Sequence, residues 1–131
     1  MFEHLSQDGA KSFIKEVKRV LKSGGVVRIA VPDLKIYTDA YLKSGDADTF
    51  MKRLLVQAPE IKTLKQKINL LVSGYRHHQW MYDGNSLKKL LLEMGLKNAA
   101  ICTNGKTNIS NYGALDLFER KKNSVYVEAI N

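Results

Sequence analysis

The sequence is poor in cysteine and proline, and it contains no long apolar run. Its single cysteine, Cys102, cannot form an internal disulfide, so a reducing cytoplasm is the simplest setting. Two prolines and a hydrophobic content of 44% argue against disorder. No apolar stretch reaches the roughly 18 residues that a membrane-spanning helix needs, and the opening "MFEHLSQDG" lacks the pattern of a signal peptide. These absences predict an ordered cytoplasmic domain without a membrane partner.

Length and charge further narrow the class of protein and its possible partners. A chain of 131 residues is long enough for one domain with a real core, which we place over residues 1–131. The formal net charge is +8, but the cations are scattered between apolar residues at helical spacing. Such a pattern is typical of a solvated helix face, and it leaves nucleic acid open as a weakly supported partner. We find no zinc-ligand spacing, RNA-binding aromatic signature or helix-turn-helix pattern.

The first half of the sequence predicts a helix, a glycine turn and a buried strand. "DGAKSFIKEVKRVLK" (8–22) has the apolar spacing of an amphipathic helix, with Ser6 or Asp8 as its cap. We expect Gly24 and its neighbours to end this helix. "VVRIAV" (26–31) then predicts a strand that is buried on both faces and stops at Pro32.

The remainder predicts a helical insertion followed by two strands. Residues 34–73 carry three apolar stripes with breaks near 43–46 and at Pro59, which indicates a helical lid, substrate wall or oligomer surface. An ordered loop is expected over 74–84, then a helix capped by Asn85 or Ser86. The last strands are predicted at 97–103, where Cys102 is expected to be a buried structural thiol, and at 124–130.

Four segments in this order resemble the class I S-adenosylmethionine-dependent methyltransferases. "EHL" (3–5) is similar to the segment after that family's fourth strand, and "RVLKSGG" (19–25) resembles its "R-V-L-K-P-G-G" turn, with Ser23 in place of proline. "GYRHHQWMYDGNSLKKLLLEMGL" (74–96) resembles a later loop and helix, and "SVYVEAI" resembles the last, antiparallel strand. The resemblance covers nearly the whole chain.

The resemblance implies an α/β fold equal to the back half of a Rossmann-like methyltransferase. The family's strand order is 3-2-1-4-5-7-6, and this sequence would supply strands 5, 7 and 6 with flanking helices, while strands 1–4 are absent. S-adenosylmethionine would be the cofactor and a small-molecule or sugar-type compound the methyl acceptor. The glycine-rich turn that holds this cofactor is missing, because Gly24 and Gly25 follow a helix. We therefore expect a truncated chain, or one part of a split enzyme, that is inactive alone.

A missing fourth strand would leave one edge of strand 26–31 open. An apolar strand with a bare edge pairs readily with another chain. The sequence therefore predicts a homodimer or higher oligomer, formed through that edge or by exchange of the first helix. The alternative to an enzyme is a binding module that has lost catalysis and acts through this edge or its basic surface.

The candidate site residues come from three places in the sequence. Glu3 and His4 would border the cofactor. Pro32, Asp33 and Tyr37 follow the fifth strand; we expect Asp33 either to cap the next helix or to face substrate, and Tyr37 either to pack or to face substrate.

The loop at 74–84 holds the densest polar and aromatic cluster. Arg76 and Trp80 are candidates for substrate contact, and His77, His78 and Tyr82 are candidates for a general base. The alternative is a loop packed on the sheet through Trp80 and Tyr82. Adjacent histidines point in different directions in extended backbone, so we predict no metal site there.

Overall fold

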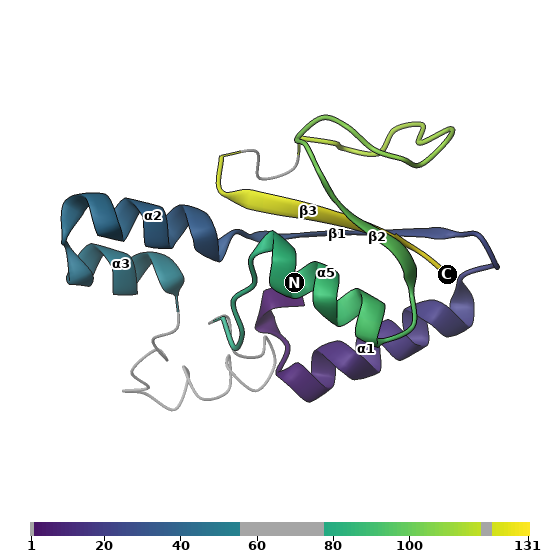
Figure 1. The fold of residues 1–131 in the computed structure, drawn as a ribbon, viewed down its shortest axis with the longest axis horizontal. Helices are drawn as coiled ribbons and strands as arrows, with labels where there is room; N and C mark the ends of the chain where they lie inside the picture. The colour runs from purple at the N-terminus through teal and green to yellow at the C-terminus, as the bar shows by residue number, and fades with distance from the viewer. Residues whose placement is uncertain (1, 56–77, 119–121) are drawn as a thin grey trace, which may run out of the picture.

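The computed structural model describes residues 2–55, 78–118 and 122–131. A 3₁₀ helix, η1, opens this part of the chain, and four α-helices and three strands follow (Figure 1). The elements are η1 (Phe2–His4), α1 (Gln7–Val20), β1 (Val26–Pro32), α2 (Leu34–Ser44), α3 (Ala47–Leu54), α5 (Gly84–Glu93), β2 (Lys97–Cys102) and β3 (Ser124–Ile130). The helix expected over 60–73 and the break at Pro59 lie outside the described residues.

The strands form a mixed α/β architecture around one sheet of order β1-β3-β2. β3 lies between the other two and pairs antiparallel with both, so β1 and β2 run in the same direction. The register places Ile29 opposite Val127 and Ala100 opposite Glu128. The predicted pairing of strand 26–31 with the last strand is confirmed, although β1 continues through Pro32, which we expected to end it.

Helices α1 and α5 cover one face of the sheet (Figure 1). Side chains alternate along a strand, so every second residue of β1 and β3 faces these helices. Ile29, Val31 and Val127 belong to the same buried cluster as Ile14 of α1 and Leu91 of α5. The amphipathic pattern of 8–22 therefore reports a real buried stripe, which is the main apolar core of the described residues.

The ends of α1 and α5 differ in part from the sequence-based expectation. Ser6 caps α1 as one of the two expected residues, but the helix ends at Val20, and Gly24 adopts its left-handed conformation (φ 79°) in the turn beyond. Asp83 caps α5, rather than Asn85 or Ser86. The Asp83 carboxylate accepts a hydrogen bond from the Ser86 N–H, and the Ser86 hydroxyl accepts one from the Asp83 N–H, which forms a capping box.

The described part of the helical insertion is a pair of short helices beyond the carboxyl end of β1 (Figure 1). Asp33 caps α2, which is one of the two roles expected for it, and Gly45 (φ 67°) is the C-terminal cap of α2. Asp46 caps α3, and the ring of Tyr41 lies 5.1 Å from that of Phe50 across the pair. Within the described ranges, no helix is long and apolar enough to cross a membrane.

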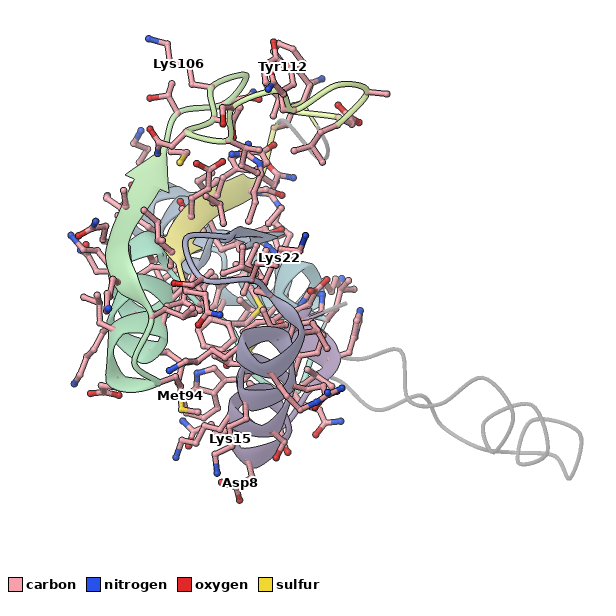
Figure 2. All side chains as sticks on the ribbon, turned by 90° about the vertical axis from the view of Figure 1, so that its right-hand side faces the viewer. Asp8, Lys15, Lys22, Met94, Lys106 and Tyr112 are labelled. Carbon is pink, nitrogen blue, oxygen red and sulfur yellow. The ribbon has the colours of Figure 1, made fainter. Side chains whose placement is uncertain are left out.

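A loop over residues 103–118 covers the other face of the sheet, opposite to the helices. Figure 2 shows Lys106 and Tyr112 of this loop at the far side of the sheet from Asp8 and Lys15 of α1. Arg28 and Glu128 form a buried ion pair on this face, with Nη1 and Oε1 2.7 Å apart. Glu128 also accepts hydrogen bonds from the Thr107 hydroxyl and the Asn108 N–H, which tie the loop to β3.

The free edge of β1 has a defined set of outward backbone groups. Asp33 N–H donates to Asn123 and Asn131 N–H donates to Gly25, so the odd-numbered residues of β1 bond to β3. Antiparallel pairing alternates, which turns the N–H and C=O groups of Val26, Arg28 and Ala30 to the other edge. No described strand pairs with that edge.

Candidate functional site

The candidate site lies at the carboxyl end of β1, where η1, the start of α2 and the loop over 78–83 meet. Figure 1 shows the amino terminus beside the loop that leads into α5. Backbone hydrogen bonds connect this loop to three other segments: Gln79 N and Trp80 N donate to Glu3 O (2.9 and 3.3 Å), His78 N to Leu55 O (2.9 Å), and Leu34 N to Tyr82 O (2.9 Å). A short parallel bridge between Asp33 and Tyr82 extends the pairing of β1. The described part of the loop is thus an ordered wall of this junction.

Glu3, His4 and His78 come together at this junction. Glu3 is 1% exposed and His78 is 6% exposed, whereas the side chain of His4 is 32% exposed. His4 Nε2 lies 3.6 Å from Glu3 Oε1, and the two imidazole rings lie 5.1 Å apart. The sequence placed Glu3 and His4 in one candidate group and His78 in another, so their contact is a product of the fold.

Pro32 is the last residue of β1, and Asp33 follows it as the cap of α2. Burial raises the pKa of Asp33, and the nearby Asp83 and Asp39 add to that effect, while the Lys35 N–H opposes it. The carboxylate caps α2 by accepting the Lys35 N–H at 3.0 Å. This hydrogen bond uses one of the two carboxylate oxygens of Asp33.

Tyr82 and Trp80 have different environments. Tyr82 is 3% exposed, and its ring lies 5.3 Å from that of Phe2 in the apolar core. Its hydroxyl has no hydrogen-bond partner among the described residues. Burial raises the pKa of Tyr82, so the phenol keeps its proton near neutral pH and suits a hydrogen-bond donor better than a base. Trp80 is exposed.

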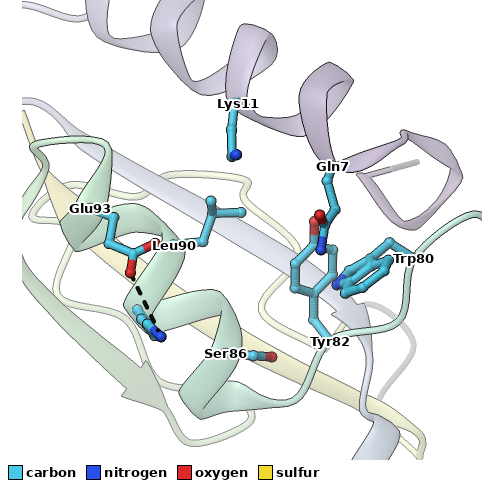
Figure 3. Close-up of a pocket in the computed structure, with 8 residues that line it drawn as sticks. Gln7, Lys11, Trp80, Tyr82, Ser86, Leu90 and Glu93 are labelled. Atoms are coloured by element: carbon cyan, nitrogen blue, oxygen red, sulfur yellow. Dashed lines mark ion pairs between the residues drawn. The ribbon is translucent and has the colours of Figure 1, made fainter.

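An open pocket of about 270 Å³ lies beside these two aromatic residues, between α1 and α5 (Figure 3). Ligand sites typically have volumes of about 300–1,000 Å³, so this pocket is small for one. Its lining combines amide, ammonium, hydroxyl and carboxylate groups from the two helices with the two aromatic rings: Gln7, Lys11, Trp80, Tyr82, Ser86, Lys89, Leu90 and Glu93. The pocket can hold a small polar group or one end of a larger molecule.

The other predicted residues are placed as follows. Tyr37 is half-buried on α2. Arg76 and His77 lie outside the described residues. Cys102, on β2, is only partly buried. Burial and the negative charge of the nearby Glu128 both raise the pKa of the Cys102 thiol, which keeps the thiol protonated.

Sequence reasoning missed the polar residues that α1 and α5 bring to the pocket. Lys11 and Lys89 stand on helix faces that the sequence describes only as polar. Which polar positions meet is set by how two helices pack on the same sheet, and periodicity within one helix carries no such information. Comparison with protein-family models and with curated proteins found no match for this chain.

Proposed function

We propose that these residues form the C-terminal part of a class I S-adenosylmethionine-dependent methyltransferase, acting on a small-molecule or sugar-type acceptor. The observation that carries the proposal is the strand order. An antiparallel strand, last in the sequence, lies between two strands that share one direction. This is the arrangement that the resemblance implies for strands 5, 7 and 6, and the segments "EHL" and "QWMYDG" lie at the end of β1, where ligands bind in open α/β folds.

The described residues do not fit a whole S-adenosylmethionine molecule. The glycine pair Gly24 and Gly25 precedes β1, at the opposite end of that strand from the junction. No glycine-rich turn follows a described strand at the junction. We infer that Glu3, His4 and Asp33 form one wall of the site, and that strands from outside these residues complete it.

Within that wall, the side chains suit positioning. Trp80 offers an exposed ring for an apolar acceptor surface, and the Tyr82 hydroxyl offers a donor. Transfer of a methyl group to oxygen or nitrogen releases a proton, for which His4 and His78 are the described candidate bases. S-adenosylmethionine would supply the methyl group, and the protein would act mainly by orienting the acceptor.

The test compares the native species with the isolated chain. An antibody against residues 2–55 would capture the endogenous protein under non-denaturing conditions. The captured material would be probed by photocrosslinking with tritiated S-adenosylmethionine and then sized by immunoblot. We expect label in the native species and none above background in the isolated 131-residue chain. A native species that takes no label, at any size, would overturn the proposal.

The open edge of β1 supports a second proposal, that the isolated chain forms a homo-oligomer by pairing these edges. Outward N–H and C=O groups at Val26, Arg28 and Ala30 are a template for a second strand. Pairing would protect the outward amides of Arg28 and Ala30 from hydrogen exchange as strongly as the inward amides of Ile29 and Val31.

The variant Ala30→Pro tests this pairing, because it removes one outward N–H and no bond between β1 and β3. We expect it to shift the light-scattering mass to that of a monomer while the circular dichroism spectrum is kept. Leu42→Ser is the matched control, since Leu42 is 78% exposed on α2, away from the edge. A mass that responds to Leu42→Ser but not to Ala30→Pro would place the contact on the helix pair. A monomer that binds nucleic acid in a salt-sensitive way would favour the binding-module alternative.

A further inference from the structure

We propose that Glu3, His4 and His78 bind a divalent transition-metal ion, and that Zn²⁺ is the ion they suit best. This proposal does not require methyl transfer, and where the ion is bound, His4 and His78 are its ligands and not bases. The site brings together the Glu3 carboxylate and the His4 imidazole of η1 with the His78 imidazole of the loop before α5.

The geometry is close to that of a coordination shell. One possible ligand atom from each of the three residues lies within 4.8 Å of the other two. His4 Nε2 and Glu3 Oε1 are already 3.6 Å apart. Tetrahedral Zn²⁺ with bonds of about 2.0–2.2 Å separates its ligand atoms by about 3.3–3.5 Å. The longest of these separations would therefore have to shorten by up to about 1.5 Å for a tetrahedral ion to bind all three residues.

The chemistry of the donors favours zinc over the common hard cations. Two imidazole nitrogens and one carboxylate oxygen form the ligand set of open zinc sites, whereas Mg²⁺ and Ca²⁺ take oxygen ligands. The three protein ligands would leave a fourth position for water. His4 is the most exposed of the three residues, so the ion and its water would enter from the side of His4.

The site is shielded from solvent on the side of the Glu3 carboxylate, which is 1% exposed. An ion bound to it would act at bonding distance and would be only weakly screened by solvent.

The backbone holds the ligands in place before any ion binds. Glu3 O accepts the N–H groups of Gln79 and Trp80, and His78 N–H donates to Leu55. These bonds connect η1 to the loop before α5, and that loop to the end of α3. An ion bound to the three ligands would fasten η1 to the loop before α5 and stabilise the fold by mass action.

The experiment uses the whole chain without an affinity tag and titrates it with ZnCl₂ and CoCl₂. We expect Zn²⁺ to raise Tm and Co²⁺ to give the strong visible absorption of a tetrahedral site. Both effects should weaken by more than about tenfold in affinity in Glu3→Gln and His78→Gln, since loss of even an outer-shell partner costs 10–100-fold. Glu16→Gln is the matched control, because Glu16 is an exposed carboxylate on α1 that pairs with Arg19; it should bind like the parent chain.

Two outcomes would overturn the site. One is a folded parent chain that shows neither a Tm shift nor a tetrahedral cobalt spectrum. The other is parent-like binding by Glu3→Gln and His78→Gln, which would mean adventitious surface binding. If either variant fails to fold, imidazole nitrogen shifts in the parent chain decide the question. Zn²⁺ must then move the signals of both His4 and His78 at the same stoichiometry. If it moves the signal of only one of them, or of neither, the proposal is rejected.

Discussion

The two faces of the sheet are stabilised in different ways. The face under α1 and α5 is an apolar core in which Ile14, Leu91 and Val127 are almost completely buried. The face under the loop over 103–118 is organised around the Arg28–Glu128 ion pair, whose side chains are 7% and 2% exposed. Both faces exclude water, but one does so with interchangeable apolar groups and the other with a specific set of charges and hydrogen bonds.

This difference should appear in how each face responds to damage. Apolar contacts are numerous and individually weak, so a truncated side chain leaves a cavity that its neighbours partly fill. A buried charge has few partners, and removal of one partner leaves the other uncompensated. The loop has no described helix or strand of its own, and side-chain hydrogen bonds attach it to the sheet: Glu128 accepts from Thr107 and Asn108, and Arg28 donates to Lys106 O. A truncated side chain on the helix face should therefore weaken the packing only in part, whereas loss of one charged partner on the loop face should detach the loop.

Arg28→Met should give the largest effect, because it leaves the Glu128 carboxylate buried without its cation. We expect the free energy of unfolding to fall by about 3–5 kcal/mol, measured by urea denaturation. The loop should also lose its protection from hydrogen exchange at Asn108. The double variant Arg28→Met/Glu128→Leu should be less destabilised than the sum of the two single variants. Strict additivity would show that the two charges are not coupled, and that the ion pair does not organise this face.

Leu91→Ala should have the next largest effect and acts on the helix face. The lost transfer free energy and the cavity should cost about 2–5 kcal/mol. In this variant the amide of Asn108 should keep its protection at denaturant concentrations where the chain stays folded, since the loop and α5 lie on opposite faces of the sheet. Leu92→Ala is the control, because Leu92 is exposed on the same helix, and its unfolding midpoint should barely change. A loss of loop protection in Leu91→Ala would mean that the two faces unfold together.

The sequence predicts the helix face well and the loop face poorly, for a physical reason. Periodicity records which side chains are apolar, and it correctly places α1, β1, β2, α5 and β3. Arg28 interrupts an apolar strand by one residue, and its partner on β3 is set by the register Arg28↔Glu128. Such a pairing exists only once the strands are aligned. The same holds for the candidate site: Asp33 follows directly from a strand that ends, whereas the meeting of Glu3 with His78 depends on how the loop folds back.

The smallest expected effect tests the charge of Glu128 by pH. Burial raises the pKa of Glu128, but hydrogen bonds from Thr107, Asn108 and Arg28 outweigh it and hold the pKa below its usual value. A carboxyl whose pKa is lower in the folded state stabilises the fold fully above its unfolded pKa of about 4.3, and this stabilisation is lost as pH falls through the folded pKa.

Glu128→Gln should therefore cost about 1.5–3 kcal/mol near neutral pH, the value of hydrogen bonds to a charged group. Arg28 is not left without a partner in this variant, because its guanidinium also donates to Lys106 O and lies over the Tyr126 ring. The difference between the parent chain and this variant should shrink at acid pH, as measured by urea midpoints between pH 7 and pH 3. Glu93→Gln is the control, because Glu93 is an exposed carboxylate on α5 with a long ion pair to Lys89 (3.8 Å). Its difference from the parent should stay small throughout. A Glu128→Gln difference that is constant with pH would mean that shape, and not charge, holds the loop on this face.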